Sequence, residues 1–155
     1  GFGLAGRAGA LLGTSVSGGG DFNGDGLQDL IVGAPGQGSN KGAAYIIYGA
    51  HSHPLRMDSA SLLCTHGIEI ELAEGGAHSV AGSLGGYSVA MIGDWNGDGR
   101  EDVAIGAPNQ GREDRDDCGV VYVVFGRATS CTSGRRLLAK RPNPGKPTRP
   151  DAGGG

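Results

Sequence analysis

The feature that most constrains the fold of this chain is an internal repeat. Residues 21–35 read DFNGDGLQDLIVGAP and residues 94–108 read DWNGDGREDVAIGAP, an offset of 73 residues. A Gly-x-Ser-Val segment precedes each copy, at 13–16 and 86–89. Downstream, GAAYIIYG at 42–49 returns as GVVYVVFG at 119–126. Four segments that recur in one order predict two structural units of the same design.

Each unit is predicted to consist of short strands separated by glycine-rich turns, which suits a chain with 33 Gly among 155 residues. The strands expected in the first unit are residues 14–18, 29–33, 43–48 and 67–72. Those expected in the second are residues 87–92, 102–106 and 120–125, with no evident fourth strand. Residues 1–4 resemble the end of an earlier fourth strand.

Four antiparallel strands joined by hairpins are typical of a β-propeller blade. The predicted fold class is therefore all-β, with four-stranded antiparallel β-propeller blades, about two blades of a larger propeller. A blade buries its apolar faces mainly against its neighbours. We therefore expect the strand at 120–125 to present an unpaired apolar edge, which favours association of the isolated chain.

Charge divides the chain into two parts. Residues 1–126 contain 6 Lys or Arg and 15 Asp or Glu, whereas residues 127–155 contain 7 Lys or Arg and one Asp. An acidic body argues against a nucleic-acid partner. The basic part is rich in Pro and Gly and is predicted to be a disordered tail. No apolar run approaches the ~18 residues of a membrane helix, so no transmembrane segment is expected in this chain.

The repeated acidic segment carries the chemistry of a metal site. Oxygen-bearing side chains stand at positions 1, 3, 5 and 9 of each nine-residue loop, and the residue at position 7 can add its backbone carbonyl. Hard oxygen donors with three carboxylates suit Ca²⁺ better than zinc or copper. The predicted ligands of two calcium sites are Asp21, Asn23, Asp25, Leu27, Asp29, Asp94, Asn96, Asp98, Arg100 and Asp102.

Two other interpretations of the acidic loops are less consistent with the residues. A simple turn would leave three carboxylates repelling one another within nine residues. An EF-hand requires a Glu at position 12, where Val32 and Ile105 stand, and helical flanks where the sequence is β-prone. We therefore expect each loop to join the first two strands of a hairpin.

Gly-x-Ser-Val, Asp-x-Asn-Gly-Asp-Gly-x-x-Asp, Gly-Ala-Pro and the final Tyr-rich strand together resemble the FG-GAP repeat of integrin α-chain propellers. Similar repeats occur in glycosylphosphatidylinositol-specific phospholipase D and in bacterial surface proteins. The resemblance covers residues 1–126, as repeats of about 1–72 and 73–126. Leu12-Gly13 and Leu84-Gly85 stand where the family has Phe-Gly. The resemblance to the FG-GAP repeat implies a seven-bladed parent propeller with calcium loops on one face and ligand-binding loops on the other.

The function that this resemblance implies is a calcium-binding recognition or adhesion scaffold, extracellular or at the cell surface. Its partners would be a protein or glycan ligand and the remaining blades of the parent propeller. The alternative is an accessory propeller domain of a secreted hydrolase such as a phospholipase D of this type. No Ser/His/Asp or Cys/His set shows nucleophile spacing, so the repeats themselves are not expected to be an enzyme.

Several further residues admit a functional and a plain interpretation. The histidines and the cysteine of the connection before residue 67 could hold zinc, but a polar loop is the preferred interpretation. The charged run 112–117 could contact a ligand or be a solvated loop. Any disulfide is expected to join Cys64 to Cys131, because a strand of about 26 Å separates Cys118 from Cys131. The residues of the possible zinc group are His51, His53, Cys64 and His66.

Overall fold

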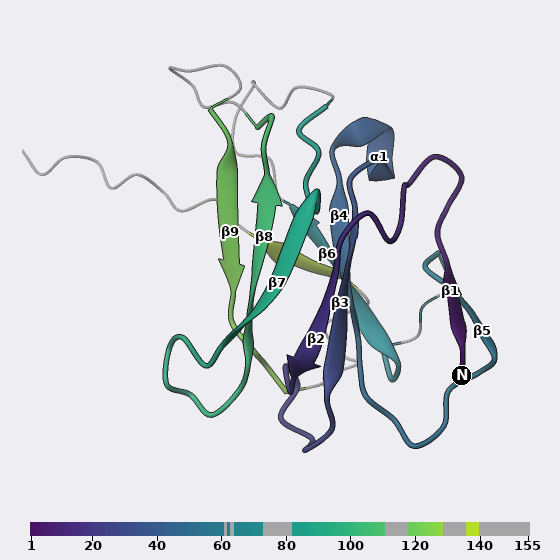
Figure 1. Cartoon of the computed structure of the whole chain (residues 1–155), viewed down its shortest axis with the longest axis vertical. Coiled ribbons are helices and arrows are strands. Elements are labelled where there is room, and N and C mark those ends of the chain that lie inside the picture. Colours follow the sequence, from purple (N-terminus) through teal and green to yellow (C-terminus); the bar gives the residue numbers. More distant parts are fainter. Residues whose placement is uncertain (61, 63, 73–81, 111–117, 129–135, 140–155) are drawn as a thin grey trace, which may run out of the picture.

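The strands of the molecule form three sheets that stand side by side (Figure 1). The structure is a computed structural model that describes residues 1–60, 62, 64–72, 82–110, 118–128 and 136–139. No helix in these ranges has the length and apolar character to cross a bilayer. The elements are β1 (Gly3–Ala5), β2 (Val16–Gly20), β3 (Asp29–Ala34), α1 (Gln37–Asn40), β4 (Ala43–Ile47), β5 (Arg56–Asp58), β6 (Gly67–Leu72), β7 (Ser88–Gly93), β8 (Asp102–Ala107), β9 (Val120–Val124) and β10 (Arg136–Ala139).

The first repeat forms the predicted four-stranded antiparallel blade. In the sheet, the strands follow the order β2, β3, β4 and β6, and each neighbouring pair is antiparallel. Ile31 lies opposite Ile46, which lies opposite Ile68. Because side chains alternate between the faces of a strand, these three residues share one apolar face, and the opposed pair Val32 and Tyr45 lies on the other. We call this four-stranded unit the first blade.

The second repeat forms a three-stranded antiparallel sheet of β7, β8 and β9, here called the second blade. Its register repeats that of the first blade: Ala104 lies opposite Val123, as Ile31 lies opposite Ile46. An irregularity in the first hairpin also recurs, at Gly18–Gly20 and at Met91–Gly93. The expected strands of both repeats are confirmed to within two residues at each end.

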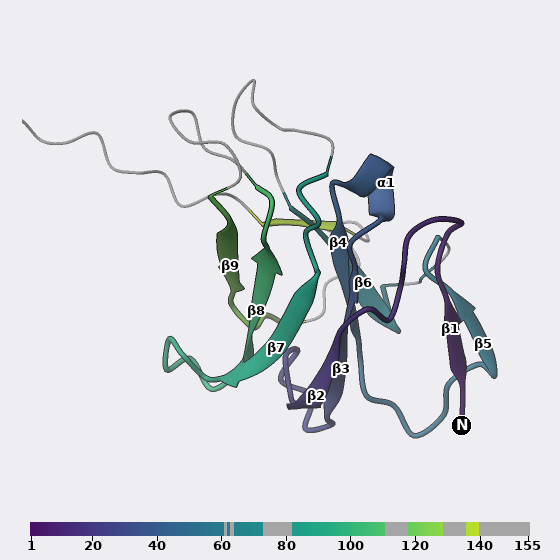
Figure 2. The ribbon, with the colours of Figure 1, turned by 45° about the horizontal axis from the view of Figure 1, so that its top comes forward.

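The two blades pack face to face through one apolar cluster. Ile31, Ile46 and Ile70 of the first blade are fully buried with Ile105 and Tyr122 of the second. Each buried side chain of this size contributes about 1.5–3 kcal/mol relative to an exposed one. This cluster is the larger core of the molecule and fixes how the two repeats are placed (Figure 2).

Backbone contacts accompany the packing of the blades. The hydroxyls of Ser15 and Ser17 accept hydrogen bonds from the N–H groups of Val89 and Met91, each at 3.1 Å. A side chain at Gly33 would collide with the carbonyl oxygen of Gly86 on the second blade. The glycine of the first Gly-Ala-Pro segment is therefore required by the contact between the blades.

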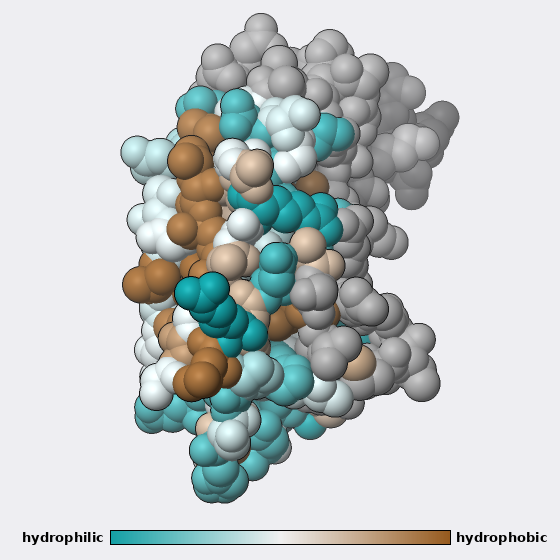
Figure 3. Space-filling view, turned by 90° about the vertical axis from the view of Figure 1, so that its right-hand side faces the viewer, coloured by the Kyte–Doolittle hydropathy of each residue, from teal (hydrophilic) through white to brown (hydrophobic). Residues whose placement is uncertain are grey.

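The opposite face of the first blade is covered by the N-terminal segment and by β5. Val32, Tyr45 and Ile47 are buried there against Ala10 and Met57. Strand β1 pairs in parallel with β5 in a separate two-stranded sheet. The expectation that residues 1–4 end an earlier blade strand stays a prediction, because the strand partner of β1 among the described residues is β5, which belongs to neither blade. This end of the molecule also exposes apolar side chains (Figure 3), including Phe2, Leu11 and Leu55.

Strand β10 corrects the prediction of a disordered tail for four of its residues. It pairs in parallel with β6 and adds a fifth strand to the first blade. Leu137 packs against the cluster between the blades, and Ala139 is buried in it. This apolar contact outweighs the basic, Pro-rich composition on which the prediction rested. Residues 140–155 lie outside the described part of the chain.

The outer face of the second blade is apolar and open. The residues of this face correspond to first-blade residues that are covered by the second blade. Ala44, Ile46 and Tyr48 are 0%, 0% and 3% exposed, whereas their counterparts Val121, Val123 and Phe125 are 64%, 45% and 50% exposed. The same strand pattern is thus buried in one repeat and exposed in the next.

We expect the isolated chain to form concentration-dependent oligomers, because this open face buries apolar area only against another molecule. The double substitution Val121→Lys and Val123→Lys should reduce association, as measured by light scattering over a concentration series. Leu55→Lys, which changes a still more exposed apolar residue at the other end of the molecule, is the control and should leave association unchanged. A monodisperse wild-type monomer with a sharp, cooperative melt would contradict the prediction.

Candidate metal-binding loops

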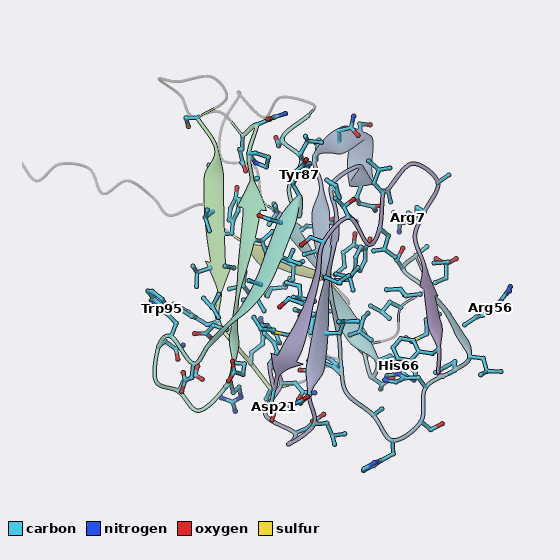
Figure 4. The ribbon with its side chains drawn as sticks, in the orientation of Figure 1. Arg7, Asp21, Arg56, His66, Tyr87 and Trp95 are labelled. Carbon is cyan, nitrogen blue, oxygen red and sulfur yellow. The ribbon has the colours of Figure 1, made fainter. Side chains whose placement is uncertain are left out.

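Both predicted loops lie where the sequence places them, between the first two strands of each blade. The first joins β2 to β3 and the second joins β7 to β8. Asp21 and Trp95, labelled in Figure 4, mark these loops at the same end of the molecule. The two acidic segments, far apart in sequence, are thus brought to one rim of the paired blades.

The first carboxylate of each loop is enclosed by backbone N–H groups. Asp21 accepts hydrogen bonds from the N–H groups of Gly24, Asp25 and Gly26 at 2.7, 3.1 and 2.7 Å. The chain can curl around this side chain because Gly24 and Gly26 have φ angles of 77° and 86°, which glycine adopts at little cost. Asp94 makes the three corresponding bonds at 2.7, 3.0 and 2.8 Å.

The residues at positions 3 and 5 are tied to each other. The side-chain amide of Asn23 donates to Oδ2 of Asp25 at 2.8 Å, and its Oδ1 accepts from the N–H of Asp25 at 3.0 Å. Asn96 and Asp98 repeat both bonds at 2.9 Å. Leu27 donates its N–H to Asp25 at 2.8 Å. The internal hydrogen bonds of the two loops therefore match atom for atom.

The aspartate at position 9 anchors the loop to the rest of its blade, a role that the sequence prediction missed. Asp29 is buried; its Oδ2 accepts from Phe22 and Asn23, and its Oδ1 accepts from Gly49 at 2.7 Å. Asp102 does the same through Gly126 at 2.8 Å. Each carboxylate therefore links the first hairpin to the end of the third strand. The signal in the sequence is an Asp at the first position of a buried apolar strand.

Burial raises the pKa of Asp29 above its ordinary value of 3.8, and the negative charge of Asp25 adds to the increase. Backbone N–H groups of Gly49, Phe22 and Asn23 oppose the shift. Since the folded pKa lies above the unfolded one, the protonated form favours folding at low pH. That stabilisation is lost as pH rises through the folded value.

We predict that ¹³C NMR titration of the Asp29 carboxyl in chelator-treated protein gives a midpoint above 3.8. The physical reason is the cost of charging a buried carboxylate beside a second one. An aspartate in an unstructured reference peptide serves as the control. A midpoint at or below that of the reference would show that the three N–H groups outweigh burial.

The acidic side chains do not converge into a metal cage as the loops stand. Among the described residues, no three His, Cys, Asp or Glu side chains are grouped closely enough to hold a metal ion. Their carboxylate oxygens are instead directed to N–H groups. Asn23 and Asn96, together with the carbonyls at Leu27 and Arg100, would complete the predicted oxygen donor set. Its chemistry, three carboxylates and an amide oxygen in nine residues, fits calcium.

The remaining candidate residues are placed as follows. The rings of His53 and His66 lie 6.0 Å apart, but Cys64 is disulfide-bonded and cannot supply a zinc-binding thiolate. Cys118 is free and exposed, in agreement with the disulfide prediction, although Cys131 lies outside the described residues. The charged run 112–117 also lies outside them.

The second blade braces the first loop. The N–H of Glu101 donates to the carbonyl of Asp21 at 3.0 Å, and that of Arg127 donates to Phe22 at 2.9 Å. A Cβ atom at Gly24 would lie 3.0 Å from Nε of Arg100, whereas one at Gly97 would meet nothing within 4 Å. The two loops are alike internally but differ in their surroundings.

This difference predicts unequal effects of one substitution. Gly24→Ala and Gly97→Ala each place a side chain at a φ angle near 76°, which costs about 1–2 kcal/mol. Gly24→Ala must also displace Arg100, so it should lower the free energy of unfolding more than its matched control Gly97→Ala does. Denaturant titration of both variants tests this. Equal losses in the free energy of unfolding would contradict the prediction, because they would mean that the Arg100 side chain moves aside at no cost.

Blades stacked face to face, each with an acidic loop between its first two strands, define this chain as part of a β-propeller. Residues 12–47 and 85–124 match the FG-GAP repeat, whose repeats form propeller blades, and the chain belongs to the FG-GAP repeat family. It is 38% identical over 68% of its length to phosphatidylinositol-glycan-specific phospholipase D of Bos taurus. It is 33% identical over 81% of its length to integrin alpha-4 of Xenopus laevis, and 42% identical over 57% to integrin alpha-M of Mus musculus.

The matched region is a small part of each relative. It covers 12% of the phospholipase, 11% of integrin alpha-4 and 7% of integrin alpha-M. The similarity therefore concerns the repeats and not the whole of any of these proteins.

Proposed function

We propose that this chain is a non-enzymatic, calcium-stiffened recognition or adhesion scaffold that acts outside the cell or at its surface. The observation that carries the proposal is the pair of matching acidic loops on one rim of the stacked blades. In each, three carboxylates and an amide oxygen lie within nine residues, the hard donor set that calcium prefers. The similarity to integrin alpha chains supports a role in recognition.

Calcium would be held by the residues that the sequence predicts: Asp21, Asn23, Asp25 and Asp29 with the carbonyl of Leu27, and their counterparts in the second loop. The ion supplies positive charge that offsets the mutual repulsion of the carboxylates. Asp29 and Asp102 would connect the calcium-bound loop rigidly to its blade. Asp29 also accepts a hydrogen bond from Gly49 after the third strand, and Asp102 accepts one from Gly126. The loops would then hold neighbouring hairpins in place for a ligand.

The compartment and partners follow from the same features. The disulfide at Cys64 suits an oxidising environment. The partners would be a protein or glycan ligand and further blades, one of which would cover Val121, Val123 and Phe125. The acidic body does not suit nucleic acid.

A second candidate is an accessory propeller domain of a secreted hydrolase. The observation that favours it is the 38% identity to phosphatidylinositol-glycan-specific phospholipase D. The reading frame that encodes the chain separates the candidates: a catalytic domain beside the repeats supports the hydrolase, and further repeats with a membrane anchor support the scaffold.

We predict that calorimetric titration detects two calcium sites, and that Asp25→Ala and Asp98→Ala each remove one. Extracellular calcium modules have a Kd of ~10⁻⁴–10⁻³ M. A free concentration tenfold above Kd would add about 1.4 kcal/mol of stability per site. Asp58→Ala, which removes an acidic side chain outside the loops, is the control and should leave both sites. Absence of calcium binding to the folded protein would falsify the proposal.

A further inference from the structure

Arg100 belongs to the second loop by its backbone and to the first loop by its side chain. Its N–H donates to Oδ1 of Asp98 at 3.0 Å, which fixes the backbone within the second loop. Its side chain crosses to the first blade, where a Cβ atom at Gly24 would lie 3.0 Å from Nε and 3.5 Å from Cγ. One residue therefore spans both acidic loops.

The guanidinium of Arg100 contains one nitrogen that is unpaired within the described part of the chain. Its Nε is buried and has no hydrogen-bond partner among the described residues. The loop that it approaches carries the carboxylates of Asp21 and Asp25, and Gly24 itself donates its N–H to Asp21. A guanidinium is always charged, so a fixed positive charge stands beside an acidic loop.

The first loop does not supply the second loop with an equivalent cation. The position that corresponds to Arg100 in the first loop is Leu27, an uncharged residue that packs against Gly49 of its own blade. Gly97, the counterpart of Gly24, has nothing within 4 Å of its Cβ position. The two loops therefore share their internal bonds but not their electrostatic environment.

We infer that Arg100 is a tethered counter-cation of the first loop, which stabilises that loop without metal and weakens its affinity for calcium. The inference rests on the proposed calcium function. A fixed positive charge attracts the carboxylates of the empty loop but repels a divalent ion that enters it. The second blade thus regulates the metal site of the first through one side chain.

The first test isolates the first loop with Asp98→Asn, which removes a carboxylate of the second site but keeps an oxygen that can accept from the N–H of Arg100. In this background, Arg100→Met removes the charge and keeps the stem, and Arg100→Lys keeps the charge. By calorimetry at low salt, R100M should raise the calcium association constant about three- to tenfold. The calcium association constant of R100K should stay within twofold of that of the same background with Arg100 intact. The difference should shrink in 0.5 M salt.

Equal calcium affinities of R100M and R100K at low salt would overturn the inference, because packing and not charge would then be the role of Arg100. A second readout needs no calcium. In excess chelator, R100M should melt about 2–4 °C below R100K, since the empty first loop loses its counter-cation. Equal melting temperatures would also overturn the inference. If no variant binds calcium, the proposed function fails, and the chelator comparison still decides the role of Arg100.

Discussion

The apolar contact between the two blades is the interaction on which the rest of the structure depends. Neither sheet can bury both of its faces alone, and the buried Ile31, Ile46 and Ile70 lie in one cluster with Ile105 and Tyr122 of the second blade. The same contact brings Glu101 and Arg127 into hydrogen bonds with the first loop. Packing in the core and bracing of the acidic rim are consequences of a single interface.

The negative charges of the loop carboxylates are stabilised by hydrogen bonds within each loop and, in the first loop, by a nearby cation. Inside each loop, backbone N–H groups surround the first carboxylate, and the buried Asp29 and Asp102 take N–H groups from both the loop and the end of the third strand. Between the loops, the two copies differ, because the side chain of Arg100 in the second loop reaches Gly24 of the first, whereas its counterpart Leu27 is uncharged. Loops with the same pattern of acidic residues can therefore differ in electrostatics when one of them differs at a single variable position.

The molecule is asymmetric along its stack. The N-terminal segment and β5 cover one face of the first blade, with Met57 and Ala10 against Tyr45. At the other end, Val121, Val123 and Phe125 occupy positions that the first blade keeps buried. A repeat built on one pattern thus ends in a covered face on one side and in an open, apolar face on the other, as expected when blades rely on their neighbours.

The sequence by itself determined the repeat, the blade strands and the position of both acidic loops, because these follow from local patterns: alternating apolar residues, turn glycines and a nine-residue spacing of oxygens. Tertiary structure decided what local patterns do not encode. Strand β10 and the pairing of β1 with β5 depend on backbone partners far away in sequence. The anchoring role of Asp29 and the reach of Arg100 to Gly24 likewise depend on groups that meet only when strands and blades pack, since hydrogen bonds and charges act across space and not along the chain.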